Sequence, residues 1–464
     1  MKTRRINIDC IGPLFFRLCT WLFAAVLFAS CKKYLDQPSS KSLVIPKTIQ
    51  DLQALAELYV NSGSNQSSYP DLGEILSDDY YLTTAQWQQN LSGGSSNDAL
   101  HYVWNGASIP KDNYWRGPYV SVYYSNVILD ILPTIPINDN NKNAWNELKG
   151  ESLFTRGMQL WNIAQLYCKP YSSTASTDPG VPLRLDPEFH EKSVRSTVSE
   201  TYTQIINDLK TAVQYLPETN PYTPFHATRA AAYGALARVY LSMRDYQNAK
   251  TSADECLQRA NYLLDYTTLN ASSATPIPLF NNEILYYSEA GSFGYYGLAD
   301  TNLIQSFDTA DIRKKIFFTY DAIAGGYKFK GSYTRLPYAD FPGIATDEIY
   351  LIRAECDAHL GDATSAMSDL NILAKKRHSL NWTPYSSTDP NDALNKVLDE
   401  RRKELFSRTL RWSDLRRFNV EHNNTSLQRF VGGQYYHLQP NDLRWVVLIP
   451  QDVINYSGMQ QNPR

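Results

Sequence analysis

Helical periodicity is the feature that most restricts what this chain can fold into. Apolar residues recur three and four positions apart over long stretches, which is typical of helices that bury one face. One such stretch runs from about Trp145 to Tyr167, and another from about Val198 to Leu216, where Pro217 ends it. The pattern predicts five more helices, at about 228–243, 246–260, 347–360, 363–376 and 392–408. We therefore expect a mainly α fold.

Two of the predicted helix pairs share a register. Ala237 is followed by Ala249, and Ala354 by Ala366, each twelve residues later and across a charged turn. Small residues at such positions let two helices approach closely, as in tetratricopeptide repeats. The pairs lie far apart in the chain, so they are not tandem. We interpret them as degenerate repeats, and generic helix pairing is the alternative.

Two long segments, at about 61–113 and 267–345, differ from the helical scaffold of residues 145–260 and 346–418. They are rich in Gly, Ser, Asn and Tyr and show little helical period. Long irregular segments inside a domain are usually functional or disordered, and the aromatic residues argue against disorder. We expect a ligand to bind there.

Aromatic side chains are the candidate ligand contacts, since the 464 residues include 33 Tyr and 9 Trp. Amphipathic rings can stack on sugars, and nearby amides or carboxylates can bind hydroxyl groups. Trp87 has glutamine and asparagine neighbours, Tyr80 and Tyr81 follow two aspartates, and Tyr295 and Tyr296 lie in a glycine-rich loop. For any single ring, local packing is the alternative.

The N-terminus indicates export and a lipid anchor. Basic residues precede thirteen uncharged residues at 18–30, which end in Ala29 and Ser30 before Cys31. As a helix this run rises only about 20 Å, too short for a bilayer core of about 30 Å. The pattern is that of a signal peptide at 1–30, and the cysteine resembles that of a bacterial lipobox, so we expect Cys31 to be acylated. Ordinary secretion with an incidental cysteine is the alternative.

The arginine-rich run at 399–417 does not indicate nucleic-acid binding, because helical geometry turns part of it inward. Arg401 falls on the apolar stripe between Leu398 and Leu405, and Glu355 lies on the inward face of its own helix. A buried guanidinium needs a carboxylate, so we predict a structural ion pair between Glu355 and Arg401. The formal net charge of −3, with signs interspersed, gives no further case for nucleic acid.

Signs of catalysis or metal binding are weak. The sequence has no HExxH, GxSxG, P-loop or GxGxxG motif. The cysteines Cys168, Cys256 and Cys356 form no CxxC, so no zinc site or disulfide framework is indicated. Asp78 and Asp79 could hold a cation such as calcium, but exposed carboxylate pairs are mostly solvated. We assign no catalytic residue, no metal ligand and no cofactor.

Several short segments, in this order, resemble the SusD/RagB family of nutrient-binding lipoproteins of Bacteroidetes. The match extends over nearly the whole chain after residue 30. Its segments are Cys31-Lys-Lys-Tyr-Leu-Asp36, Gly150–Arg156, Pro179–Leu183, Leu351–Glu355 with Leu360–Asp362, Glu400–Leu405 with Arg411–Arg417, Leu448–Pro450 and Gln461–Pro463.

The resemblance implies a SusD-like domain at 31–464, with a tetratricopeptide-like scaffold and a ligand held by variable loops. It implies a non-catalytic lipoprotein of the outer-membrane surface. Such a protein captures an oligosaccharide for a SusC-like TonB-dependent transporter. A peptide-binding, RagB-like lipoprotein and a helical-repeat interaction scaffold without a small ligand are the alternatives.

Overall fold

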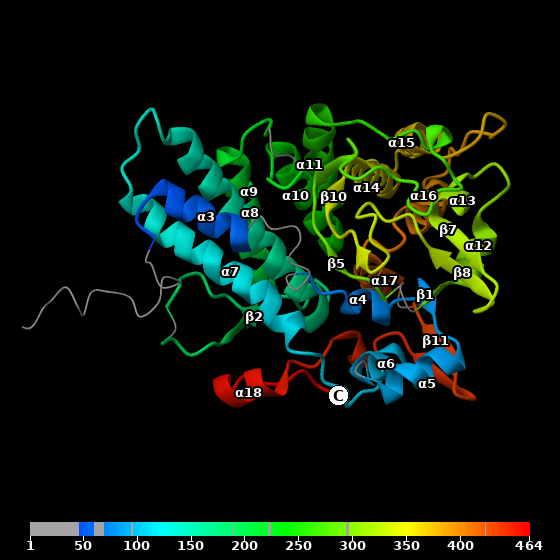
Figure 1. The fold of residues 1–464 in the computed structure, drawn as a ribbon, viewed down its shortest axis with the longest axis horizontal. Helices are drawn as coiled ribbons and strands as arrows, with labels where there is room; N and C mark the ends of the chain where they lie inside the picture. Colours follow the sequence, from blue (N-terminus) through cyan, green and yellow to red (C-terminus); the bar gives the residue numbers. More distant parts are fainter. Residues whose placement is uncertain are drawn as a thin grey trace, which may run out of the picture. The chain divides into compact units, whose positions relative to one another are not determined.

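The computed structural model describes residues 46–59, 69–93, 96–188, 190–220, 224–293, 297–422 and 424–464. The chain divides into two units, 1–47 and 48–464, and every helix and strand named below belongs to the second (Figure 1). The predicted signal peptide and Cys31 lie outside the described residues.

Long helices form most of the scaffold. They are α3 (Ile49–Tyr59), α7 (Asn113–Ile131), α8 (Lys142–Tyr167), α9 (Val198–Tyr215), α10 (Arg229–Met243), α11 (Tyr246–Arg259), α14 (Thr346–His359), α15 (Ala363–Ala374), α16 (Pro390–Glu404) and α17 (Arg411–His422). The predicted helices are confirmed to within a few residues at each end. We did not predict three of them, which are α3, α7, whose first turns contain Gly117 and Pro118, and α17, which begins inside the arginine-rich run.

Helix α8 packs between α7 and α9 (Figure 1) and is buried along most of its length. A methyl group at Gly150 would lie 2.8 Å from Cγ of Leu216, so glycine is what permits the close approach at this point. Helix α9 begins with a capping box, in which Thr197 and Glu200 satisfy each other's free backbone N–H groups.

The two predicted helix pairs are α10–α11 and α14–α15, and α11 packs against α14, so the pairs are adjacent in space. Ala237, Ala249, Ala354 and Ala366 are all fully buried. In both pairs an aspartate after the turn caps the second helix, because its side chain accepts a hydrogen bond from a backbone N–H three residues later.

The remaining elements are short. The helices are α4 (Leu72–Leu76), α5 (Thr84–Ser92), α6 (Ser96–Tyr102), α12 (Thr301–Ser306), α13 (Arg313–Phe317) and α18 (Gln451–Ser457), with 3₁₀ turns η1 (Leu132–Thr134), η2 (Tyr266–Thr268) and η4 (Leu443–Trp445). Antiparallel strands pair as β1 (Tyr80–Tyr81) with β6 (Leu298–Ala299), β2 (Pro179–Pro182) with β3 (Arg195–Thr197), β4 (Ile284–Tyr286) with β10 (Ile344–Ala345), β5 (Ala290–Gly291) with β9 (Ala339–Asp340), β7 (Phe318–Asp321) with β8 (Gly326–Phe329), and β11 (Leu427–Val431) with β12 (Gln434–Leu438).

The predicted ion pair between Glu355 and Arg401 is wrong in its partners. Arg417 binds Glu355 instead, with Nη2 2.9 Å from Oε2, and Arg401 places Nε 2.9 Å from Oδ2 of Asp414. Arg417 Nε also donates to Asp414 Oδ1 at 2.9 Å. The four side chains form one buried network between α14, α16 and α17. Glu355 and Arg401 are thus both buried in ion pairs, but Arg417 and Asp414 lie between them.

Cys168, Cys256 and Cys356 are buried, unpaired thiols. Across the described ranges, no helix has both the length and the apolar character needed to cross a membrane.

Candidate ligand-binding surface

Both irregular segments meet at strand β1. Its Tyr80 and Tyr81 pair with Ala299 and Leu298 of β6, and β6 in turn packs against β8. Helix α5 follows β1 directly, and the β11–β12 hairpin lies against it, where the Gly432 N–H donates to Thr84 Oγ1 at 3.1 Å. The result is a surface built from parts of the chain that are hundreds of residues apart (Figure 1).

Trp87 lies on α5 and is half-buried. Its Nε1 donates to the carbonyl oxygen of Ala99 at 2.9 Å, and its ring centroid is 6.3 Å from that of Tyr436. Of its amide neighbours, Gln86 accepts from the backbone N–H of Thr83 as part of the helix cap, whereas Gln88 and Gln89 are exposed. The Trp87 ring is thus held in place on a helix that also carries exposed amides.

Tyr80 does not face a ligand. It is 2 % exposed, and its hydroxyl donates to Ser407 Oγ at 2.8 Å. Burial raises its pKa well above the ordinary value. The expectation for Tyr80 is therefore wrong, because this ring packs the core beneath the surface.

Tyr81 is partly exposed, and its role as a ligand contact stays a prediction. Its hydroxyl lies beside Gly326, 2.7 Å from where a methyl group on that glycine would sit. Burial, and then the charge of the Tyr320 phenolate, raise the pKa of Tyr81 above its ordinary value. Tyr295 and Tyr296 lie outside the described residues.

Two tyrosines of the β7–β8 hairpin complete the surface. Tyr320 pairs across the strands with Tyr327, and the ring centroids are 5.3 Å apart. Tyr320 is 58 % exposed. We call Tyr81, Trp87, Tyr320, Tyr327 and Tyr436 the aromatic surface.

The sequence analysis missed Tyr320, Tyr327 and Tyr436, although a signal was present. Tyr320 and Tyr327 lie in short alternating runs at 318–321 and 327–329 on either side of a turn, which is the pattern of a hairpin. For Tyr436 the signal is weaker, since residues 434–438 do not alternate but follow two glycines at 432–433, which are typical of a hairpin turn. The β11–β12 hairpin also presents Phe430 and Tyr435 on its outer face, with ring centroids 4.7 Å apart and both rings more than half exposed.

A partly buried charge network fixes the chain just before β1. Arg411 binds Asp78 with both Nε and Nη2, at 2.7 and 2.9 Å, and Arg402 lies 3.2 Å from the same carboxylate. Burial would raise the pKa of Asp78, but the charge and hydrogen bonds of Arg411 outweigh it and hold that pKa below its ordinary value. Burial raises the pKa of Asp79 to about 7. Arginines therefore occupy the aspartates that could have held a cation.

One group among the described residues has the composition of a metal site. Ligand atoms of Glu147, Glu151 and His226 lie within 4.8 Å of one another. His226 Nδ1 is 2.7 Å from Glu151 Oε1, and Asn220 Nδ2 hydrogen-bonds Glu147. Through these hydrogen bonds, the group links α8 to the segment before α10.

Comparison with known proteins agrees with this architecture. Residues 33–241 match the family described as "Starch-binding associating with outer membrane", and residues 298–462 match the "SusD family". No curated protein matches the sequence significantly.

Among solved structures, a SusD superfamily protein from Bacteroides thetaiotaomicron VPI-5482 matches with a TM-score of 0.71 at 22% identity, over 90% of this chain and 100% of its own. A SusD superfamily protein from Bacteroides vulgatus ATCC 8482 gives 0.73 at 21%, over 90% and 99%. A laminarin-binding SusD-like protein gives 0.66 at 18%, over 90% and 100%. These likenesses establish the fold, and together the two sequence matches cover most of the chain. The protein therefore belongs to the SusD/RagB family and has its mainly α, SusD-like fold.

Proposed function

We propose that this protein captures an oligosaccharide at the outer-membrane surface and delivers it, without catalysis, to a SusC-like TonB-dependent transporter. The observation that carries the proposal is the aromatic surface, whose rings lie on β1, α5 and two hairpins that pairing and packing bring together, with exposed amides on α5. Rings can stack on the apolar faces of sugars, while amides exchange hydrogen bonds with hydroxyl groups.

Lipid attachment at Cys31 suits this function. An anchored binding protein stays next to its transporter, so its effective concentration there is high and ligand transfer needs no diffusion through the medium. The similarity to a laminarin-binding SusD-like protein supports a glycan over a peptide as the ligand.

The test is a titration of the full-length protein, in detergent, with a panel of neutral oligosaccharides and peptides, followed by calorimetry. We expect one class of glycan to bind without product formation. Tyr320→Ala should weaken that binding about fivefold or more, since truncating a central aromatic contact typically costs over 1 kcal/mol.

Tyr262→Ala is the matched control, because Tyr262 is 46 % exposed but follows α11, on the helical scaffold. Equal affinity in the two variants would remove the aromatic surface from the proposal. Binding of peptides alone would favour the peptide-capturing alternative, and release of product would show an enzyme.

A further inference from the structure

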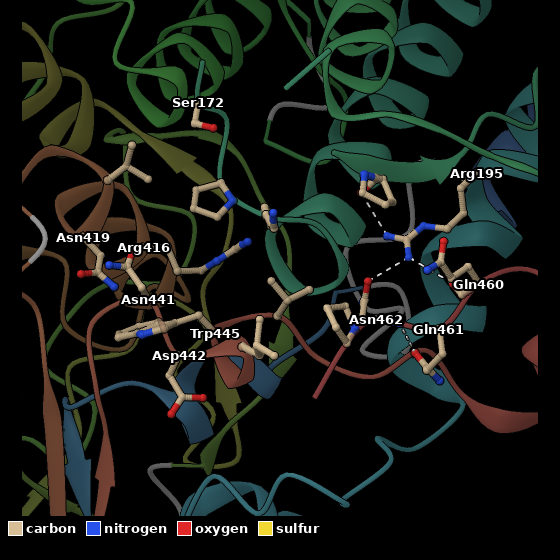
Figure 2. A pocket seen from close by; sticks show the side chains of 17 residues that line it. Ser172, Arg195, Arg416, Asn419, Asn441, Asp442, Trp445, Gln460, Gln461 and Asn462 are labelled. Carbon is tan, nitrogen blue, oxygen red and sulfur yellow. Dashed lines mark hydrogen bonds between the residues drawn. The ribbon is translucent and has the colours of Figure 1, made fainter. Parts of the chain in front are cut away.

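A cavity of about 660 Å³ lies between the end of α8, helix α17 and the C-terminal segment at 441–463 (Figure 2). None of the residues of the aromatic surface lines it. Its volume is within the range of sites that bind small organic molecules, which is roughly 300–1,000 Å³.

Two arginines on different sides of this cavity lack a carboxylate partner (Figure 2). The first, Arg416 of α17, is 2 % exposed and donates to the carbonyl oxygens of Gln165 and Cys168 at the end of α8. Its Nε has no hydrogen-bond partner among the described residues. Burial lowers the pKa of this guanidinium to about 10, so it remains charged at neutral pH.

The second, Arg195 of β3, is also held by neutral acceptors. It donates to the carbonyl oxygen of Gly180 and to Asn462 Oδ1, both at 2.8 Å, and to the carbonyl oxygen of Pro179 at 3.0 Å. No carboxylate of the described chain comes within 4.0 Å of Arg195 or Arg416, although most of the buried arginines have one.

The other charges around the cavity do not neutralise these two. Asp442 is bound by Arg444, with Nη2 2.6 Å from Oδ2, and Lys169 is paired with Asp178 at 2.7 Å. The carbonyl groups at the end of α8 supply only about half a negative charge, against two full positive charges. The cavity therefore has an excess positive potential that favours an anion.

The rest of the lining suits a sugar more than a bare inorganic ion. Asn419 is 7 % exposed, and its Oδ1 has no donor among the described residues, so a ligand hydroxyl could satisfy it. The Gln460 side chain is exposed at the cavity, and the apolar side chains of Val420 and Leu443 are partly exposed on its wall. These groups match the hydroxyls and the apolar face of a pyranose ring.

We propose that this cavity is a second binding site, which takes a sugar acid of the uronate class. Arg195 and Arg416 attract the carboxylate, Asn419 accepts from a hydroxyl group, and Val420 and Leu443 contact the ring. This site is independent of the aromatic surface and of the glycan that we propose to bind there.

The test compares digalacturonate with galactobiose, its neutral counterpart, by calorimetry on the full-length protein in detergent. Val420 lies on α17, is 38 % exposed and lines the cavity, so Val420→Glu and Val420→Gln differ only in the charge that they add. We expect digalacturonate alone to bind, and Val420→Glu to bind it about tenfold more weakly than Val420→Gln through charge repulsion.

Absence of digalacturonate binding, equal binding of galactobiose, or equal effects of the two Val420 variants would overturn the proposal. So would sodium sulfate binding as tightly as digalacturonate, since it would indicate a bare anion site. Matching thermal melting curves confirm that both variants fold. Tyr320→Ala should leave digalacturonate binding unchanged, so failure at one site is distinguishable from failure at the other.

Discussion

At the tip of the β11–β12 hairpin, Gly432 and Gly433 both have positive φ, at +61° and +78°. A methyl group on Gly432 would lie 2.9 Å from the ring of Trp87, whereas one on Gly433 would meet nothing within 4 Å. Both Gly→Ala changes should cost about 1 kcal/mol in backbone strain. Only Gly432→Ala should also displace Trp87, which would shift its fluorescence emission and weaken glycan binding. Identical spectra for the two variants would contradict this role.

The buried network around Glu355 has its own expected cost. Glu355→Gln leaves the Arg417 guanidinium short of a charge partner at a fully buried site, so we expect a loss of about 3–5 kcal/mol in the free energy of unfolding. The exposed pair of Asp112 and Arg116 is the control, and Asp112→Asn should cost less than about 1 kcal/mol. Urea denaturation measures both, and equal losses would show that burial does not make the Glu355 pair important.

Adjacent residues show what sequence reasoning could and could not settle at this scale. Tyr80 and Tyr81 follow each other in a strand, so their side chains must point to opposite faces, and at most one could meet a ligand there. Which one does so depends on β6 and Ser407, which come from distant parts of the chain. Likewise, the helical period turned Glu355 and Arg401 inward, but the choice of partner depends on how α17 crosses them.

At the scale of elements, the helices were predictable because period, caps and breakers agree within each segment. Thr197 and Glu200 mark the start of α9, and Pro217 closely follows its end. Helix α7 was missed because Gly117 and Pro118 are typical of a turn, yet the helix continues through the proline at the cost of one backbone hydrogen bond. The hairpins were missed because each strand is too short for its alternation to stand out from a loop.

Strand β9 ends in a carboxyl group that should make stability depend on pH. Asp340 is fully buried and accepts from Ser407 Oγ, and burial raises its pKa to about 8. The folded state therefore holds a proton that the unfolded state has already lost above about pH 4. The stabilisation that this proton gives the folded state is complete below about pH 4 and is lost as the pH rises through about 8.

Compared with Asp340→Asn, the wild-type free energy of unfolding should fall between pH 6 and pH 8 by up to about 1.4 kcal/mol per pH unit. Asp321→Asn is the control. Asp321 is the last residue of β7, and a hydrogen bond from the Ala324 backbone lowers its pKa, so the effect of the change should be flat in this range. Urea denaturation at several pH values provides the measurement. Parallel curves for wild type and Asp340→Asn would contradict the assignment.

For the whole molecule, the scaffold and the candidate site were predictable to different degrees. Helix pairs far apart in the sequence stack as α11 against α14, because each has an alanine face that only another helix can cover. The aromatic surface has no such pattern, since its rings are brought together by pairing between short strands and by the packing of a hairpin on α5. Composition located the chain segments that carry the aromatic surface, but it did not identify the individual rings.

The last prediction concerns attachment, which involves the whole chain. If Cys31 is acylated, the chain is held in the membrane by buried hydrocarbon at about 0.8 kcal/mol per CH₂ group. Cys31→Ser should then move the protein from the membrane fraction to the soluble fraction without changing its affinity for glycan, because the aromatic surface lies in the unit at 48–464. Cys19→Ser, inside the predicted signal peptide, is the matched control and should leave the protein in the membrane. If both variants fractionate like the wild type, the anchor is not the thiol of Cys31, and capture next to a transporter would need a different means of attachment.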